Sequence, residues 1–276
     1  MQAKTLIVVG MHRSGTSLIT NWLNHCGLQV GECLLGDNHG NIEGHFEDLE
    51  FLRMHEEILV SNNLPSSGLI EDKEINISIY QQEKIKTIIR IKNKLYKQWG
   101  WKEPRTCLFL NTYRELLPNS KYLIIVRDYQ SVINSLLKRD FFEVEKKYMS
   151  RVFFQRLMWS SFKRNWKKGK FYRNNAEHYL KVWIAYNENI LDMLKELPDE
   201  DYIVINYSLL EKSDEQIFSF LTKAWGFALR YFSFNEVYKE NLMSAPIDLN
   251  PFIKDQDLLS KAKSVETDFK KYIVAF

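Results

Sequence analysis

The first part of the chain combines an apolar strand, a glycine-containing loop and a helix. Residues 5–9, Thr-Leu-Ile-Val-Val, are typical of a strand that is covered on both faces of a parallel sheet. Gly10 ends this run, and from Leu18 onward apolar side chains recur with helical spacing until Gly27. Because a parallel strand needs a crossover to reach its neighbour, this order predicts an α/β fold.

The same alternation continues along the chain. Further strands are predicted over 99–102, 122–126 and 202–206. Helices are predicted over 48–59, 80–97, 108–117, 131–139 and 214–225. We therefore expect a P-loop-like α/β architecture, in which a central parallel sheet with right-handed crossovers is flanked by helices.

The 276 residues fit one domain, 1–276, with a helical insertion at about 140–185. From about 232 to 276 the chain contains Pro246 and Pro251, and this tail is predicted to be irregular and to fold over the core as a flap. No apolar stretch is long enough for a transmembrane segment, and the N-terminus lacks the features of a signal peptide, so a cytoplasmic location is expected.

Composition narrows the function classes. The sequence is 45% hydrophobic and 26% charged, as in globular proteins, and its net charge of +3 does not indicate a nucleic-acid partner. Cys26, Cys33 and Cys107 lack metal-ligand spacing and are expected to be reduced thiols. The histidines show no metal-ligand spacing either, so no metal site is predicted.

The loop from Gly10 to Ser17 has the glycine spacing of a phosphate-binding loop. Its backbone N–H groups and the positive end of the following helix favour an anion, and Thr16 and Ser17 can add hydroxyl donors. A nucleoside-triphosphatase loop carries Lys where this chain has Thr16, and here the cation is Arg13. The loop therefore suits a ligand with single, separate phosphates better than a magnesium triphosphate.

A second anion site is predicted after residues 122–126. Arg127 follows this strand directly, and Ser135 lies on the following helix on the same face as Ser131, one turn earlier. Ligands of α/β sheets bind at the carboxyl ends of the strands, and a guanidinium with a hydroxyl suits a phosphate dianion. The sequence thus predicts two phosphate sites at one edge of the sheet.

Residues 13–17, Arg-Ser-Gly-Thr-Ser, resemble the 5′-phosphosulfate loop of the sulfotransferase superfamily, which uses 3′-phosphoadenosine 5′-phosphosulfate (PAPS). The Arg at the first position is the version found in tyrosylprotein and bacterial carbohydrate sulfotransferases. The set of Arg127 and Ser135 is similar to the family's 3′-phosphate segment, and Tyr207 with two following leucines to its Tyr-x-x-Leu step. The Gly-rich Arg-Lys segment of cytosolic members is missing near the C-terminus.

The segment 99–106, Trp-Gly-Trp-Lys-Glu-Pro-Arg-Thr, resembles the family's Lys-acidic-Pro segment. The resemblance implies that a sulfuryl group passes from PAPS to an acceptor hydroxyl, leaving 3′-phosphoadenosine 5′-phosphate and requiring no metal. Lys102 would then reach the sulfuryl oxygens, and Arg13 would serve the leaving group, where cations stabilise the growing negative charge. Arg105 either holds the acceptor or pairs with Glu103.

The general base is expected to be a Glu or His, as in the family. The candidates, in order of preference, are Glu47, Glu43 and His45, within a wider set that includes Glu32, His39 and Asp48. Each of these side chains taken alone fits better as a surface charge or as a cap for the following helix, so the prediction is only that the base lies in this set.

The stretch 153–179 is rich in basic and aromatic residues. It fits a solvated helical hairpin, a platform for an anionic glycan or lipid acceptor, or a peripheral membrane contact. Two rival functions stay open: a P-loop kinase, for which a Lys after Gly15 and a magnesium-binding acid are missing, and a non-catalytic nucleotide-binding module of the same fold.

Overall fold

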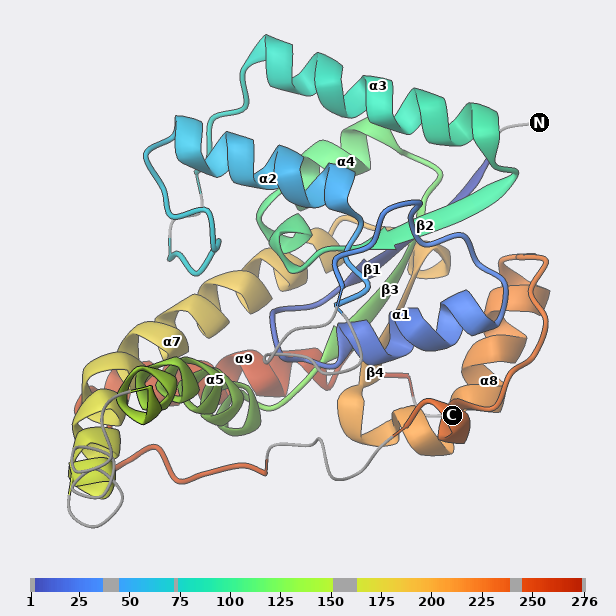
Figure 1. Cartoon of the computed structure of the whole chain (residues 1–276). Helices are drawn as coiled ribbons and strands as arrows, with labels where there is room; N and C mark the ends of the chain where they lie inside the picture. The colour runs from blue at the N-terminus through green and yellow to red at the C-terminus, as the bar shows by residue number, and fades with distance from the viewer. Residues whose placement is uncertain (1–2, 37–44, 72–73, 151–162, 239–244, 275–276) are drawn as a thin grey trace.

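The computed structural model describes residues 3–36, 45–71, 74–150, 163–238 and 245–274. Its centre is a four-stranded parallel sheet with the strand order β2-β1-β3-β4 (Figure 1). The strands are β1 (Lys4–Val9), β2 (Gln98–Lys102), β3 (Lys121–Val126) and β4 (Tyr202–Asn206). All four strand predictions are confirmed: β1, β3 and β4 are mostly apolar runs, and β2 carries Trp99 and Trp101.

Helices cover both faces of the sheet, so successive side chains of a strand enter different cores. Leu6 and Val8 pack in a core with α1 (Thr16–His25), α8 (Asp214–Ser219) and the π-helical turn Phe220–Ala224. Ile7 and Val9 pack in the larger core of the opposite face. That face is covered by α2 (Leu49–Ser61), α3 (Ile79–Leu95), α4 (Leu110–Leu116), α5 (Tyr129–Met149) and α7 (Arg164–Leu194).

Several helices differ from their predicted bounds. α5 continues ten residues past Arg139, because Phe141 and Val144 extend its apolar stripe against α7. The helix predicted over 108–117 is divided at Phe109 into the 3₁₀ turn Pro104–Leu108 and α4. The region 140–185 is mostly helical where it is described, and from Tyr172 onward α7 buries one face.

The prediction of an irregular C-terminal tail is wrong for residues 256–269. They form α9 (Gln256–Phe269), whose first turn is capped by the Asp255 carboxylate. Leu259, Ala262, Val265 and Phe269 recur with helical spacing and are buried in the larger core, where α9 packs against α7. Pro246 and Pro251 precede this helix and do not interrupt it.

Short backbone contacts lie along both outer strands. Beside β4, the N–H of Val274 donates to the carbonyl of Val204 over 3.0 Å, next to the parallel bridge of Val204 with Ile273. Beside β2, the N–H of Gly100 donates to the carbonyl of Gln29 over 2.8 Å. Within the described ranges, no helix is long and apolar enough to span a bilayer.

Candidate active site

A candidate residue lies at the carboxyl end of each strand or directly after it. The loop of residues 10–15 follows β1, Lys102 is the last residue of β2, Arg127 follows β3 and Tyr207 follows β4. The parallel register pairs Val8 with Lys102 and brings these ends to the same edge of the sheet. This is the edge at which α/β sheets bind their ligands.

The loop after β1 has an unusual backbone. Gly15 has a φ of 93° and Arg13 a φ of 70°, so a side chain other than glycine occupies the left-handed region at Arg13. The Ser14 N–H donates to the Met11 carbonyl over 3.1 Å, and α1 begins at Thr16. Such a curled loop leading into a helix N-terminus presents N–H groups suited to an anion.

Arg13 contacts both Ser135 and Arg127. Arg13 Nε donates to Ser135 Oγ over 2.8 Å, and Arg127 Nη1 donates to the Arg13 carbonyl over 3.0 Å. The Arg127 guanidinium lies over the Tyr207 ring, 4.6 Å from its centroid, and the same ring packs against Gly15. The two predicted phosphate sites are therefore adjacent.

The cations of this cluster are partly desolvated. Burial, followed by repulsion from Arg139 and Arg127, lowers the pKa of Arg13 to about 10. Burial likewise lowers the pKa of Arg127. Since desolvation and like charges both disfavour the protonated guanidinium, an anion placed here would relieve an electrostatic penalty.

Lys102 joins the loop to the segment that follows it. Its side chain is 1% exposed, and Nζ donates to Ser17 Oγ over 3.0 Å and to Glu47 Oε1 over 3.1 Å. Burial lowers the pKa of Lys102 and raises that of Glu47, and the attraction between the two charges opposes both shifts. A buried ammonium and a buried carboxylate are thus held next to the candidate phosphate loop.

Two of the three candidate bases lie together. His45 Nδ1 is 3.8 Å from Glu47 Oε1, and burial with the charge of Lys102 lowers the pKa of His45 to about 4. His45 is therefore neutral near pH 7. Glu43, the other candidate, lies outside the described residues.

Glu47 is held by the start of α2. The neighbouring Asp48 caps this helix, accepting from the Glu50 N–H over 2.9 Å, and also accepts from Lys92 Nζ of α3 over 2.7 Å. Both Asp48 and Lys92 are buried, and the Leu35 N–H donates to the Glu47 carbonyl over 2.8 Å. These bonds fix the backbone from which the Glu47 carboxylate projects.

Arg105 pairs with Glu103, the second of the two roles that the sequence left open. Arg105 Nη1 lies 2.5 Å from Glu103 Oε1, and Nε donates to the Ser66 carbonyl over 2.7 Å. Glu103 also bonds to His55 Nδ1, while His55 Nε2 is 2.7 Å from the Tyr113 hydroxyl. Burial alone would raise the pKa of Glu103, but His55 and Arg105 hold it below its usual range.

A comparison with protein families identifies the family of this chain. The sequence profile of the Sulfotransferase family matches residues 5–229, which include every candidate residue above and all four strands except Lys4, the first residue of β1. The chain belongs to the sulfotransferase family. No curated protein matches this sulfotransferase in a sequence comparison.

Solved structures agree with the family at the level of fold. Sulfotransferase STF9 from Mycobacterium avium is 12% identical, with a TM-score of 0.53 over 98% of this chain and 76% of that one. Sulfotransferase STF1 from Mycobacterium tuberculosis H37Rv has the same identity and TM-score over 99% and 77%. The sulfotransferase domain of the Synechococcus PCC 7002 olefin synthase is 14% identical, with a TM-score of 0.49 over 96% and 95%. The mycobacterial structures confirm the expected P-loop-like fold class.

Sequence reasoning missed two residues near the site of this sulfotransferase. Arg139 lies one helical turn after Ser135, and its charge contributes to the lowered pKa of both Arg13 and His45. His12 Nε2 is shielded from solvent and has no hydrogen-bond partner among the described residues. The i, i+4 spacing from Ser135 was a signal for Arg139. Nothing in the sequence distinguishes His12 from an ordinary loop residue without a function.

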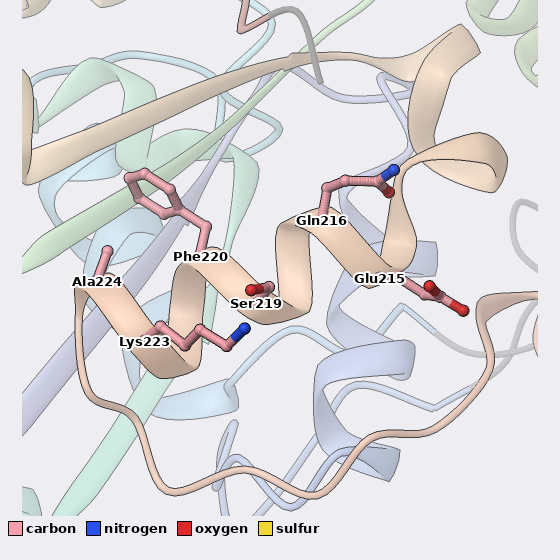
Figure 2. Close-up of a pocket in the computed structure, with 6 residues that line it drawn as sticks. All are labelled: Glu215, Gln216, Ser219, Phe220, Lys223 and Ala224. Atoms are coloured by element: carbon pink, nitrogen blue, oxygen red, sulfur yellow. The ribbon is translucent and has the colours of Figure 1, made fainter.

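Other features lie apart from this site. A hollow of about 610 Å³ on α8 and the following π-helical turn is lined by Glu215, Gln216, Ser219, Phe220, Lys223 and Ala224 (Figure 2). It shares no residue with the candidate site. In the part of the chain that the structure describes, no three His, Cys, Asp or Glu side chains are grouped to hold a metal ion.

Proposed function

We propose that this sulfotransferase takes its sulfuryl group from PAPS. The supporting observation is the contact of Arg13 with Ser135 and Arg127, which joins two anion-suited segments 122 residues apart in sequence. The 5′-phosphosulfate would lie on the loop of Arg13 and Ser14 to Ser17, and the 3′-phosphate between Arg127 and Ser135. Tyr207, packed on Gly15 and Arg127, would border the nucleotide.

The reaction would be an in-line displacement at sulfur. The acceptor hydroxyl oxygen bonds to sulfur, the bond from sulfur to the 5′-phosphate oxygen breaks, and its electron pair leaves with 3′-phosphoadenosine 5′-phosphate. Lys102 would stabilise the charge on the sulfuryl oxygens and Arg13 that on the leaving phosphate. Each such donor contributes roughly 10²–10³-fold to the rate in comparable sites.

We propose Glu47 as the base that takes the proton of the acceptor hydroxyl. Its carboxylate lies 3.1 Å from Lys102 Nζ, so base and sulfuryl cation are neighbours, and its raised pKa improves it as a proton acceptor. His45 is a weaker candidate because its pKa of about 4 disfavours protonation. The acceptor itself is proposed only as a hydroxyl of a glycan, lipid, peptide or small molecule, in the cytoplasm.

The kinase alternative finds less support in the same residues. Thr16 occupies the position of the P-loop Lys, and Arg127 that of an acid at the end of β3. The next acid, Asp128, accepts a bond from the Ser131 N–H over 2.7 Å as the cap of α5. We accordingly propose that transfer requires no metal, and expect unchanged turnover in the presence of a chelator.

Calorimetric titration with 3′-phosphoadenosine 5′-phosphate, ADP and ATP·Mg tests the donor. We expect the bisphosphate to bind most tightly and Arg127→Ala to weaken it about 10- to 100-fold, the range for a lost charged hydrogen bond. Arg173→Ala, an exposed arginine of α7, is the matched control and should leave binding unchanged. Preference for ATP·Mg, or indifference to Arg127, would favour the kinase.

Binding without turnover would favour the non-catalytic module. This is tested by incubating the protein with PAPS and a panel of hydroxyl acceptors and measuring sulfated product. Release of 3′-phosphoadenosine 5′-phosphate without any product would indicate hydrolysis of the donor and leave the acceptor to be found.

A further inference from the structure

One face of α7 carries a row of cations around an exposed tryptophan. Lys163, Lys167, Lys170 and Arg173 recur every three or four residues and so lie on one side of the helix. Lys163, Lys170 and Arg173 are exposed, and Trp166 on the same side is 59% exposed. We call these five residues the α7 basic face.

The α7 basic face belongs to the most positive part of the described chain. Residues 138–149 of α5 and 163–176 of α7 contain ten basic and three acidic side chains, a net charge of +7. The whole chain has a net charge of +3, so the remaining residues carry −4. No acidic residue occurs from 163 to 176. Such an asymmetry creates a local field that attracts anionic partners.

Apolar side chains are exposed beside these charges. Lys167 Nζ and Lys170 Nζ lie 5.4 and 5.8 Å from the Trp166 ring. On α5, which packs against α7, Met149 is 53% and Phe142 43% exposed. Tryptophan flanked by lysines is typical of membrane interfaces, where the ring enters the headgroup region and the ammonium groups meet lipid phosphates.

We propose that the α7 basic face binds the surface of an anionic lipid bilayer. The C-terminal end of α5 and the N-terminal end of α7 lie together at the margin of the molecule, away from the sheet (Figure 1). A convex helix face fits a planar surface, whereas a nucleic-acid or glycan chain is usually held in a groove of stacked aromatics and hydrogen-bonding groups. The exposed Met149 and Phe142 have no role with a polyanion but suit the acyl boundary.

A membrane at this face would lie close to the candidate site. Beside the basic face, a cavity of about 440 Å³ between α5, α7 and residues 245–252 is lined by Asn134, Lys138, Lys168 and Tyr172, among others. Asn134 adjoins Ser135, the proposed 3′-phosphate residue. On the proposed function, this position would let the enzyme take a hydroxyl acceptor from the bilayer. Bilayer binding itself requires neither PAPS nor turnover.

Vesicle co-sedimentation without nucleotide tests the proposal. We expect the full chain to bind vesicles that contain phosphatidylglycerol, to bind phosphatidylcholine vesicles far less, and to dissociate as salt is raised. The double variant Lys167→Gln/Lys170→Gln should lower the partition coefficient about 25-fold, at about fivefold per cation removed near an anionic surface. Brominated lipids should quench the tryptophan fluorescence of the wild type more than that of the Trp166→Phe variant.

The matched control lies at the C-terminal end of α3 and just beyond it, where the exposed Lys94 and Lys97 flank Leu95, which is 58% exposed. The double variant Lys94→Gln/Lys97→Gln removes the same charge and should bind vesicles like the wild type. Equal loss in both variants, or equal binding to both kinds of vesicle, would overturn the proposal. So would binding of heparin or an oligonucleotide without vesicle binding. If the wild type bound vesicles but did not bind 3′-phosphoadenosine 5′-phosphate in calorimetry, only the proposed function would be rejected.

Discussion

At the scale of single residues, Arg13 uses both its backbone and its side chain. Its φ of 70° is costly for a residue with a Cβ, by about 1–2 kcal/mol. The resulting turn is held by the bond from Arg127 to the Arg13 carbonyl and by that from Arg13 Nε to Ser135. Local strain that persists because surrounding contacts determine it is a common property of functional sites.

Gly15→Ala should disrupt the loop in two ways. An alanine is strained at the positive φ of this position, and its Cβ also meets a neighbouring side chain. A Cβ at Gly15 would lie 2.1 Å from the Tyr207 ring, so the ring, which also contacts Arg127, must shift. Gly27 has the same φ of 93° but no neighbouring atom within 4 Å, which makes Gly27→Ala the matched control. We expect the control to lose only about 1–2 kcal/mol of stability in denaturant unfolding, with donor binding intact. Equal donor binding by both variants would contradict this.

Glu47→Gln should lower kcat about 10²- to 10⁴-fold and leave donor binding unchanged, if Glu47 is the base. The carboxylate form is the active one, and burial raises the Glu47 pKa, so activity should fall on acidification at a higher pH than for an ordinary glutamate. Burial lowers the Lys102 pKa, so activity should also fall at a lower alkaline pH than for an ordinary lysine. The pH–rate profile of the variant should lack the acid limb.

The control for this experiment is Glu57→Gln, an exposed carboxylate on α2, the helix that follows Glu47. Its kcat and pH–rate profile should equal those of the wild type. An unchanged acid limb in Glu47→Gln would assign the proton transfer to another group.

At the scale of elements, the buried ion pair of Asp48 and Lys92 joins the start of α2 to α3. Lys92 is 3% and Asp48 1% exposed, and Lys92 also reaches the half-exposed Glu50. Lys92→Met should therefore cost about 3–5 kcal/mol in denaturant unfolding, because it leaves a buried carboxylate without its partner. Asp48→Asn/Lys92→Met should recover most of this, since Asn also caps helices. Lys94→Met, exposed on the same helix, is the control; a similar loss there would contradict the argument.

The elements that sequence reasoning predicted best are those with one dominant signal. Three of the strands are apolar runs, and the loop of residues 13–17, Lys102 and Arg127 lie at strand ends whose position follows from parallel topology. Ser135 lies on α5, the helix that follows one of these ends. The contact of Glu47 with Lys102 depends on how a loop after α1 folds back over β2, which no local pattern specifies. The same holds for the contact of His55 with Glu103. In α9, the visible helical spacing of apolar residues was outweighed by the two preceding prolines.

At the scale of the whole molecule, α9 is a structural part of the core. Phe269, 3% exposed, packs in the larger core with α7. Phe269→Ala should cost about 3–5 kcal/mol in thermal or denaturant unfolding, the range for a large aromatic removed from a core. Phe142→Ala on α5, where the ring is 43% exposed, should change stability by less than about 0.5 kcal/mol. Equal effects of the two variants would show that α9 is only loosely attached.

The contacts along the outer strands have a consequence for self-association. An outer strand with free N–H and C=O groups is a template on which another chain can add a strand, and repeated addition leads to aggregates. In this protein Val204 of β4 already pairs with Ile273 and Val274, and Gly100 of β2 with Gln29. At these positions an incoming strand would first have to displace a segment of the chain itself. Growth of the sheet between molecules is therefore opposed at both outer strands.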